Sequence, residues 1–386
     1  MKKRAFIIFF SIVFSVYGLV NYYIYVTGWN AISHNSFLSP VYIVVFLVLS
    51  LSFIAGRFLE RAALNWFSSL LVWIGSFWLG AMVYFLLFAL FFDLIRLINF
   101  FIPFYPHSIS SNYEQVKFVV FLCVVGIVLV IVIAGFINAG TLRIKKLNLK
   151  INKASELKQI KLVAASDIHL GTIICKTRVE KMVGLINSLN ADIVLLPGDV
   201  VDEDLGPVIK QNLGETLRKI KSKYGVFGIT GNHEYIGGVE PACKYLEEHG
   251  ITMLRDRYAE VSGIYIVGRE DRSIKQFTGK QRKPLEEITG GVDKSWPVIL
   301  MDHQPVKLSE AETNGVDLQL SGHTHHGQLW PFNFITRKVY ELCRGYMQKT
   351  NTHYYVSCGA GTWGPPIRTG SRPEILLIEL EFDSKI

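Results

Sequence analysis

The chain has 386 residues, of which half are hydrophobic, and carries a formal net charge of +8. Together with a positive mean hydropathy, this composition is unusual for a wholly soluble protein. The basic residues form no long block interleaved with aromatic residues, so nucleic acid is not an expected partner. The five cysteines are scattered without a CxxC pair, which argues against a disulfide framework and favours a reducing compartment.

Charged residues divide the chain into two parts. Residues 1–140 contain seven Lys or Arg and three Asp or Glu, whereas residues 141–386 contain the remaining 33 and 29. The charged surface of a globular protein therefore begins near Thr141. We expect residues 1–140 to form a transmembrane region and residues 141–386 to form a water-exposed domain.

The first part contains four apolar stretches that could cross about 30 Å of hydrocarbon as helices. They are residues 5–26, 41–55, 66–92 and 118–138. The first is longer than the core of a signal peptide and no small-residue cleavage site follows it, so we expect it to be retained as an anchor. Residues 93–106 are apolar but contain two charges and two prolines, which predicts an interfacial segment.

Positive charges predict the orientation of these spans. Basic residues stand before the first span, between the second and third, and after the fourth: Lys2, Lys3, Arg4, Arg57, Arg61, Arg143, Lys145, Lys146, Lys150 and Lys153. The loop of residues 27–40 has none. Because cytoplasmic loops are enriched in Lys and Arg, we expect the second part of the chain in the cytoplasm. A fifth span within residues 93–106 would reverse that side.

From Leu142 onward, apolar runs of strand length recur between helical ones. The expected strands are residues 142–151, 160–166, 193–197, 225–230, 261–267, 298–302, 318–321, 354–358 and 375–379. The expected helices are residues 176–189, 208–220 and 241–249. This order predicts an α/β sandwich.

Acidic residues, histidines and an asparagine follow the ends of these strands. They are Asp167, His169, Asp199, Asp202, Asn232, His233, Glu234, His303, His323 and His325. Because strand ends converge at one edge of a sheet, we expect these side chains to share one pocket. Neighbouring glycines, at Gly171, Gly198, Gly231 and Gly322, permit backbone turns there.

This mixture of side chains fits the cleavage of phosphate esters. That reaction needs a nucleophile at neutral pH and neutralisation of the phosphate oxygens, and a pair of metal ions supplies both. Carboxylates can bridge two ions, while imidazole and amide oxygen complete their coordination. The residue types therefore predict a site for two divalent ions, with Mn, Fe, Zn and Co fitting almost equally.

The ordered blocks D-x-H, G-D-x-x-D, G-N-H-E, H and G-H-x-H resemble the calcineurin-like metallophosphoesterases across residues 160–380. The resemblance implies a four-layer α/β/β/α sandwich of two mixed sheets. It also implies that Asp167, His169 and His325 hold one metal, that Asn232, His303 and His323 hold the other, and that Asp199 bridges them. Asp202 and His233 would form a dyad near the leaving-group oxygen, and Glu234 would support a ligand.

The motif GHTHHGQ and the sequence CGAGTWGPPIRTGSRPEI from Cys358 resemble one branch of that family. This branch contains UDP-2,3-diacylglucosamine pyrophosphatase-like and transmembrane metallophosphoesterases. The resemblance implies that N–H groups of Gly359, Gly361 and Gly364 contact a phosphate and that Arg368 clamps it. His326 stands where the branch commonly has Gly, either as a substrate contact or as a tolerated exposed side chain. Gly and Pro clusters otherwise mark turns.

These predictions lead to three hypotheses. In the first, a membrane-anchored hydrolase cleaves a phosphodiester or pyrophosphate bond in a lipid-linked substrate such as UDP-2,3-diacylglucosamine, with membrane lipids as its surroundings. In the second, a phosphomonoesterase or cyclic-nucleotide phosphodiesterase acts on a soluble substrate. In the third, the spans are a sensor or transport module and the metal domain regulates them, although the spans contain few of the ionisable residues expected on a transport path.

Overall fold

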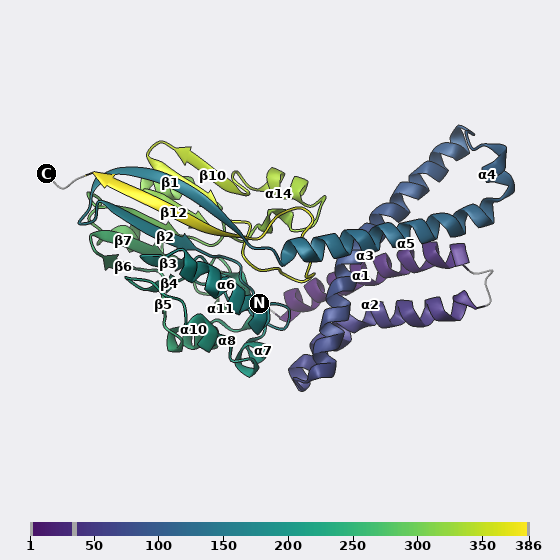
Figure 1. The fold of residues 1–386 in the computed structure, drawn as a ribbon, viewed down its shortest axis with the longest axis horizontal. Coiled ribbons are helices and arrows are strands. Elements are labelled where there is room, and N and C mark those ends of the chain that lie inside the picture. Colours follow the sequence, from purple (N-terminus) through teal and green to yellow (C-terminus); the bar gives the residue numbers. More distant parts are fainter. Residues whose placement is uncertain (1–2, 33–36, 384–386) are drawn as a thin grey trace. The chain divides into compact units, whose positions relative to one another are not determined.

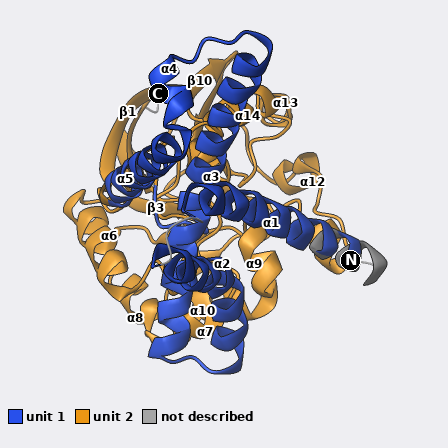
Figure 2. Cartoon of the chain, turned by 90° about the vertical axis from the view of Figure 1, so that its right-hand side faces the viewer, with its two compact units in different colours: residues 1–136, 364–367 blue, residues 137–363, 368–386 orange. Residues whose placement is uncertain are grey.

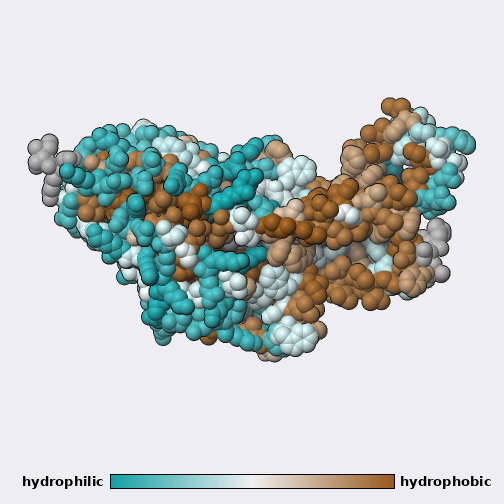
Figure 3. All heavy atoms as spheres, in the orientation of Figure 1, coloured by the Kyte–Doolittle hydropathy of each residue, from teal (hydrophilic) through white to brown (hydrophobic). Residues whose placement is uncertain are grey.

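The computed structural model describes residues 3–32 and 37–383. It falls into two compact units, which Figure 2 shows in different colours. Residues 1–136 with 364–367 form the helical unit, and residues 137–363 with 368–386 form the α/β unit. Hydrophobic surface is concentrated on the helices, whereas the α/β unit is largely hydrophilic outside (Figure 3).

The helices of the first unit are α1 (Lys3–Ile32), α2 (Leu38–Ala62), α3 (Trp66–Phe101), α4 (His107–Ser111) and α5 (Tyr113–Ala139) (Figure 1). Among the described residues, three of them, α2, α3 and α5, are long and apolar enough to cross a membrane. Helix α1 contains the first predicted span, but several of its side chains lie outside the described part of the chain.

Helix α3 includes most of the stretch predicted to be interfacial. The helix continues to Phe101, so residues 93–101 prolong the third predicted span and do not form a separate fifth helix, and their place at the interface stays a prediction. Its two charges are accommodated one helical turn apart, where Arg96 Nη1 lies 2.8 Å from Asp93 Oδ1. The helix ends just before Pro103, which has no N–H with which to extend it.

Close packing of small residues holds α2 against α3. A side chain at Gly75 would bring its Cβ within 2.2 Å of the backbone nitrogen of Phe53, so only glycine permits this approach. A small buried core lies nearby, where the indole N–H of Trp78 donates a 2.9 Å hydrogen bond to the side chain of Asn21. The described helices therefore pack through van der Waals contact supported by a few buried polar bonds.

The α/β unit contains two six-stranded sheets. The first has the order β1-β12-β2-β3-β4-β5 and the second the order β10-β11-β9-β8-β7-β6. The strands are β1 (Arg143–Ala154), β2 (Gln159–Ala164), β3 (Ile193–Leu196), β4 (Val226–Gly228), β5 (Ile251–Met253), β6 (Arg257–Val261), β7 (Ile264–Gly268), β8 (Val298–Met301), β9 (Leu318–Ser321), β10 (Gly345–Lys349), β11 (Thr352–Val356) and β12 (Glu374–Asp383).

Both sheets are mixed. In the first, β2, β3, β4 and β5 are parallel, while β12 runs antiparallel to β2 and parallel to β1. In the second, β11, β9, β8 and β7 are parallel, and β10 and β6 pair antiparallel at its two edges. The parallel strands of each sheet therefore end at one common edge.

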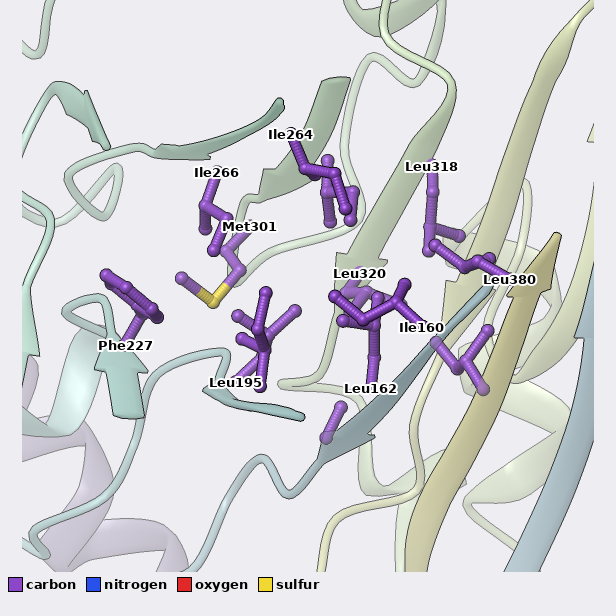
Figure 4. Close-up of a cluster of buried hydrophobic side chains, with 14 of the residues drawn as sticks. Ile160, Leu162, Leu195, Phe227, Ile264, Ile266, Met301, Leu318, Leu320 and Leu380 are labelled. Carbon is purple, nitrogen blue, oxygen red and sulfur yellow. The ribbon is translucent and has the colours of Figure 1, made fainter. Parts of the chain in front are cut away.

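The hydrophobic core lies between the sheets, where aliphatic side chains from both meet (Figure 4). Leu162 and Leu195 come from the first sheet, and Ile266 and Leu320 come from the second. Helices cover the outer faces: α6 (Lys176–Ser188), α8 (Leu213–Leu217) and α10 (Val239–Glu248) lie beside the first sheet, while α12 (Leu285–Thr289) and α13 (Ser309–Thr313) pack on the second. The predicted α/β/β/α sandwich is confirmed.

The remaining helices belong to connections between strands. They are α7 (Leu205–Lys210), α9 (Asn232–Gly237), α11 (Ile274–Thr278) and α14 (Asn333–Val339). One predicted helix, residues 208–220, is instead the pair α7 and α8. Asn212 separates them because its backbone is left-handed, with φ of 54°, a conformation that does not continue an α-helix.

We expect Leu195→Ala to lower the free energy of unfolding of the α/β unit by about 2–5 kcal/mol, because it leaves a cavity between the sheets. Leu195 is fully buried, whereas Ile209 is exposed, so Ile209→Ala is the matched control. Thermal unfolding of the full-length protein in detergent measures both. Equal shifts for the two variants would contradict a core between the sheets.

Candidate metal centre

Loops after five parallel strands meet at the common edge of the two sheets. Asp167 and His169 follow β2, Asp199 follows β3, Asn232 and His233 begin α9 after β4, His303 follows β8, and His323 and His325 follow β9. Three groups of their side chains place ligand atoms within 4.8 Å of one another: Asp167, His169 and His325; His169, Asp199 and His233; and Asp199, His303 and His323. The sequence-predicted residues are thus brought together.

The first group has its ring nitrogens turned toward a common point. Nε2 of His325 lies 3.4 Å from Asp167 Oδ1 and 3.0 Å from Nε2 of His169. Burial, together with the positive charge of Arg368 and the neighbouring His169, lowers the pKa of His325 well below its usual value. A neutral imidazole is the form that binds a metal ion.

In the third group, Nε2 of His303 lies 3.0 Å from Asp199 Oδ2. The other nitrogen of that ring, Nδ1, lies 2.8 Å from the carbonyl oxygen of Pro197, which fixes the ring and leaves Nε2 facing the site. Nδ1 of His323 lies 2.8 Å from Oδ1 of Asn232. Asp199 belongs to two of the three groups, as a bridging ligand requires.

Two buried atoms bear on whether these residues fit metal ions. Oδ2 of Asp167 and Nε2 of His303 have no hydrogen-bond partner among the described residues. A buried carboxylate oxygen without a partner is costly, and a cation at this point would satisfy it. The carboxylate, imidazole and amide donors suit a divalent transition metal. The residues present therefore fit metal ions.

Much of the ligand set has an unfavourable backbone conformation. Five of the seven predicted ligands have left-handed φ angles: Asp167 (51°), His169 (54°), Asp199 (52°), His323 (69°) and His325 (44°). Such residues cost free energy and persist only where the surrounding structure holds them, which is common at functional sites.

The glycines of the motifs mainly provide space for these ligands, and forming turns is their lesser role. A Cβ at Gly231 would lie 2.2 Å from Asp199 Oδ1, and one at Gly322 would lie 2.1 Å from Asp167 Oδ2. Of the four glycines predicted to permit turns, Gly198 has a positive φ, 85°, and the other three do not. Close approach of loop to loop is therefore the main requirement at Gly231 and Gly322.

Residues 160–327 match the calcineurin-like phosphoesterase family. An uncharacterized metallophosphoesterase from Aquifex aeolicus (strain VF5) is 31% identical over 243 residues, which covers 62% of this chain and 92% of the relative. This chain belongs to the calcineurin-like metallophosphoesterase family.

Two further relatives place the metallophosphoesterase in a wider context. An uncharacterized metallophosphoesterase from Helicobacter pylori (strain ATCC 700392 / 26695) is 36% identical over 228 residues, covering 58% of this chain and 60% of the relative. A transmembrane protein with metallophosphoesterase domain from Danio rerio is 30% identical over 267 residues, covering 65% of this chain and 60% of the relative. The chain thus spans about three fifths of either relative. In this chain, three of the described helices are long and apolar enough to cross a membrane.

A histidine and a carboxylate pair beside the candidate metal ligands of the metallophosphoesterase. Nδ1 of His233 lies 3.0 Å from Asp202 Oδ1, and its backbone N–H donates to Asp199 Oδ1 at 2.9 Å. Burial lowers the pKa of His233, but the carboxylates of Asp202, Asp199 and Glu203 outweigh burial and raise it to about 9. The predicted dyad is therefore assembled, and its imidazole is suited to hold a proton at neutral pH.

Glu234 ties two ligand loops together. Its carboxylate accepts hydrogen bonds from the backbone N–H groups of Gly231 (2.8 Å), Asp199 (3.1 Å) and Val201 (2.9 Å). Burial and the charge of Asp199 raise the pKa of Glu234 to about 7, while the three N–H groups favour its anion. This arrangement suits the supporting role predicted for Glu234.

The structure corrects the role expected for Arg368 and Gly361. Arg368 is fully buried, and its guanidinium donates to the carbonyl oxygens of Cys358 and Gly361 and to Ser371 Oγ, while Nη2 lies 3.0 Å from Nδ1 of His325. No N–H remains for a bidentate phosphate clamp. The N–H of Gly361 is likewise used, by the carbonyl oxygen of Asp167 at 2.8 Å. Arg368 instead holds the loop against a predicted ligand.

His326 is buried rather than exposed, so it is not a tolerated surface residue. Its Nδ1 lies 3.5 Å from Cys343 Sγ, and burial together with Arg344 and Arg337 lowers its pKa to about 4. Contact with substrate stays a prediction for His326, as do the individual metal ligands and the phosphate contacts of Gly359 and Gly364.

Sequence reasoning missed a polar network after β7. Asp271 accepts hydrogen bonds from Gln304, the residue after His303, and Glu270 accepts from Thr230 at 2.7 Å. Arg269 pairs with Asp302 at 3.1 Å, on the other side of His303. The sequence contains a signal for this network, because these charged residues follow an apolar strand just as the predicted ligands do. They hold the loop that presents His303.

Asp199→Asn should reduce the divalent metal bound per chain to less than half that of the unchanged protein, because an amide cannot bridge two cations with two anionic oxygens. The same change also breaks the buried contact of Asp199 with His303, so metal-free protein should unfold at a lower temperature. Elemental analysis after dialysis and thermal unfolding with and without metal measure both effects, with Asp204→Asn as control. Undiminished metal content would contradict the bridging role.

Arg368→Lys should lower the stability of the α/β unit by about 2 kcal/mol or more, because one ammonium cannot replace the guanidinium's bonds to several carbonyls. Thermal unfolding and KM should be measured together. A phosphate clamp would show the reverse pattern, a raised KM at unchanged stability.

Proposed function

We propose that this metallophosphoesterase is a membrane-anchored hydrolase that uses two divalent ions to cleave a phosphodiester or pyrophosphate bond in a membrane-borne substrate. The observation that carries this proposal is the position of Asp199, which lies within ligand distance of two histidine groups while the His233–Asp202 pair stands beside it. Family membership supports the hydrolysis of phosphate esters.

The side chains divide the chemistry between them. Bound divalent ions would neutralise the phosphate oxygens and supply an activated water. Asp202 holds Nδ1 of His233, which leaves Nε2 to give a proton to the oxygen that departs when the P–O bond breaks. Glu234 and Arg368 keep the loops of Asp199 and His325 in place while charge shifts.

The length of chain between the membrane and the site supports a membrane-borne substrate. Helix α5 ends at Ala139 and β1 begins at Arg143, so residues 140–142 form the whole connection. A link of this length spans roughly 10 Å when extended. The α/β unit is thus joined to the last predicted span by a short link, on the side that the basic residues predict to be cytoplasmic. A lipid with an activated sugar, such as UDP-2,3-diacylglucosamine, fits the resemblance of the C-terminal motif.

The test is a hydrolysis screen of metal-replete, full-length protein in nanodiscs. UDP-2,3-diacylglucosamine, long-chain phosphodiesters, bis(p-nitrophenyl) phosphate, p-nitrophenyl phosphate and a cyclic nucleotide form the panel. We expect turnover of diester or pyrophosphate bonds. Turnover of monoesters or the cyclic nucleotide alone would replace the proposal with the soluble-substrate hypothesis, and an inactive metal-loaded protein would favour a regulatory domain.

In the same screen, His233→Ala should lower kcat by roughly 10²–10⁴-fold on substrates with an alkoxide or sugar-phosphate leaving group. The loss should be smaller with p-nitrophenolate, which departs without a proton. His249→Ala, outside the site, serves as the control. Equal losses for both kinds of leaving group would argue against proton donation by His233.

A further inference from the structure

Large apolar side chains are exposed immediately after the metal-site loop. Between Leu329 and Tyr340 they include Trp330 (50% exposed), Phe332 (40%), Phe334 (53%), Ile335 (57%) and Val339 (65%). The helix within this stretch, α14, buries none of its residues. We call residues 330–339 the apolar segment. A continuous exposed run of this kind on a folded domain marks an interaction surface.

The charges of the apolar segment are all positive. It contains Arg337 and Lys338 and no acidic residue. The guanidinium of Arg337 lies 5.9 Å from the ring centroid of Phe334, so the cation and the aromatic side chain occupy the same face. Aromatic and aliphatic side chains with adjoining Lys and Arg are typical of helices that lie in the membrane interface.

Residues that flank the apolar segment lie beside the metal site. Gln328 donates from Nε2 to the carbonyl oxygen of Trp363 at 2.8 Å and accepts the N–H of Trp363 at 3.0 Å. Trp363 is half exposed, and its ring stands edge-on to His233 with centroids 5.9 Å apart. At the other end of the segment, the ring of Tyr340 lies 6.2 Å from that of His323. Apolar surface thus borders the dyad and a predicted ligand.

Two features of the chain favour a lipid bilayer over a second copy as the occupant. Residues 140–142 are the whole link between α5 and β1, so the length of the chain allows the α/β unit to reach a bilayer crossed by α5. The positive charges of the apolar segment suit anionic headgroups.

We propose that the apolar segment, with Trp363, is a membrane-docking surface that inserts into the headgroup region of the bilayer to which the chain is anchored. Docking there holds the metal site at the level of lipid phosphates, so a lipid-linked substrate is reached without leaving the membrane. The delivery of substrate rests on the proposed function, whereas insertion of the segment does not.

Photo-crosslinking tests insertion without requiring catalysis. A benzophenone amino acid replaces Phe334 in full-length protein in nanodiscs of phosphatidylcholine and phosphatidylglycerol. The matched control replaces Tyr258, which is 38% exposed on β6, at the opposite edge of the second sheet from β10. Mass spectrometry should find at least about tenfold more lipid adduct at position 334, because a buried apolar side chain excludes water there. Equal yields, no adduct at either position, or adducts of position 334 to a second chain would overturn the proposal.

A second pair of variants tests delivery. Phe334→Glu combined with Ile335→Glu should lower kcat/KM on a long-chain phosphodiester in the nanodisc by roughly tenfold, because charged side chains resist insertion. Turnover of bis(p-nitrophenyl) phosphate should stay within about twofold, since neither residue contacts the metal site. Tyr258→Glu should change neither rate. An equal loss of activity on both substrates would contradict delivery of substrate by the segment. If the protein without substitutions is inactive, the proposed function is contradicted, and the crosslinks alone test insertion.

Discussion

The loops of the metal centre bring two carboxylates, Asp167 and Asp199, into a space nearly closed to water. In the described part of the chain, only histidines form ion-pair contacts with them, and no Lys or Arg does so. Burial would raise the pKa of Asp199, yet His303, His233 and His169 hold it below its usual value. This concentration of charge calls for positive counter-charge, which bound divalent ions would supply. The rest of the domain is arranged to keep these loops in contact.

Support for the loops comes from groups that are not themselves ligands. Glu234 joins the Asp199 loop to α9, Arg368 holds the C-terminal loop against His325, and the carbonyl oxygen of Pro197 orients His303. Glu234 and Arg368 are buried and are hydrogen-bonded largely to backbone groups. Both sheets contribute ligands, and the core between them fixes the distance between the two sets.

Much of this arrangement could be predicted from the sequence, because parallel strands buried on both faces appear as continuous apolar runs and the polar residues after them converge. The apolar runs of β2, β3, β8 and β9 made the sandwich and its ligands predictable. Edge strands such as β6 and β10 were not predicted, because one of their faces is solvated and their apolar pattern is weak.

The role of Arg368 could not be predicted for a different reason. A basic residue in a Gly-rich loop has the same pattern whether it faces a phosphate or the carbonyl oxygens of its own loop. The sequence does not distinguish these two roles. In the structure, the carbonyl oxygens of the loop surround the guanidinium. The exposed helix α14 was overlooked because its apolar residues resemble those of a core helix, and sequence spacing does not reveal what covers them.

The pairing of β1 with β12 has a consequence for biosynthesis. Strand β1 directly follows the last apolar helix, but its partner in the sheet is the C-terminal strand, in the register Arg143 to Glu374. During translation β1 must therefore wait for more than two hundred further residues before it can pair. Contacts of such long sequence separation form slowly, and an unpaired strand invites aggregation. The first sheet can be completed only after β12 has left the ribosome, so nascent chains stalled before β12 would remain at the membrane with β1 unpaired.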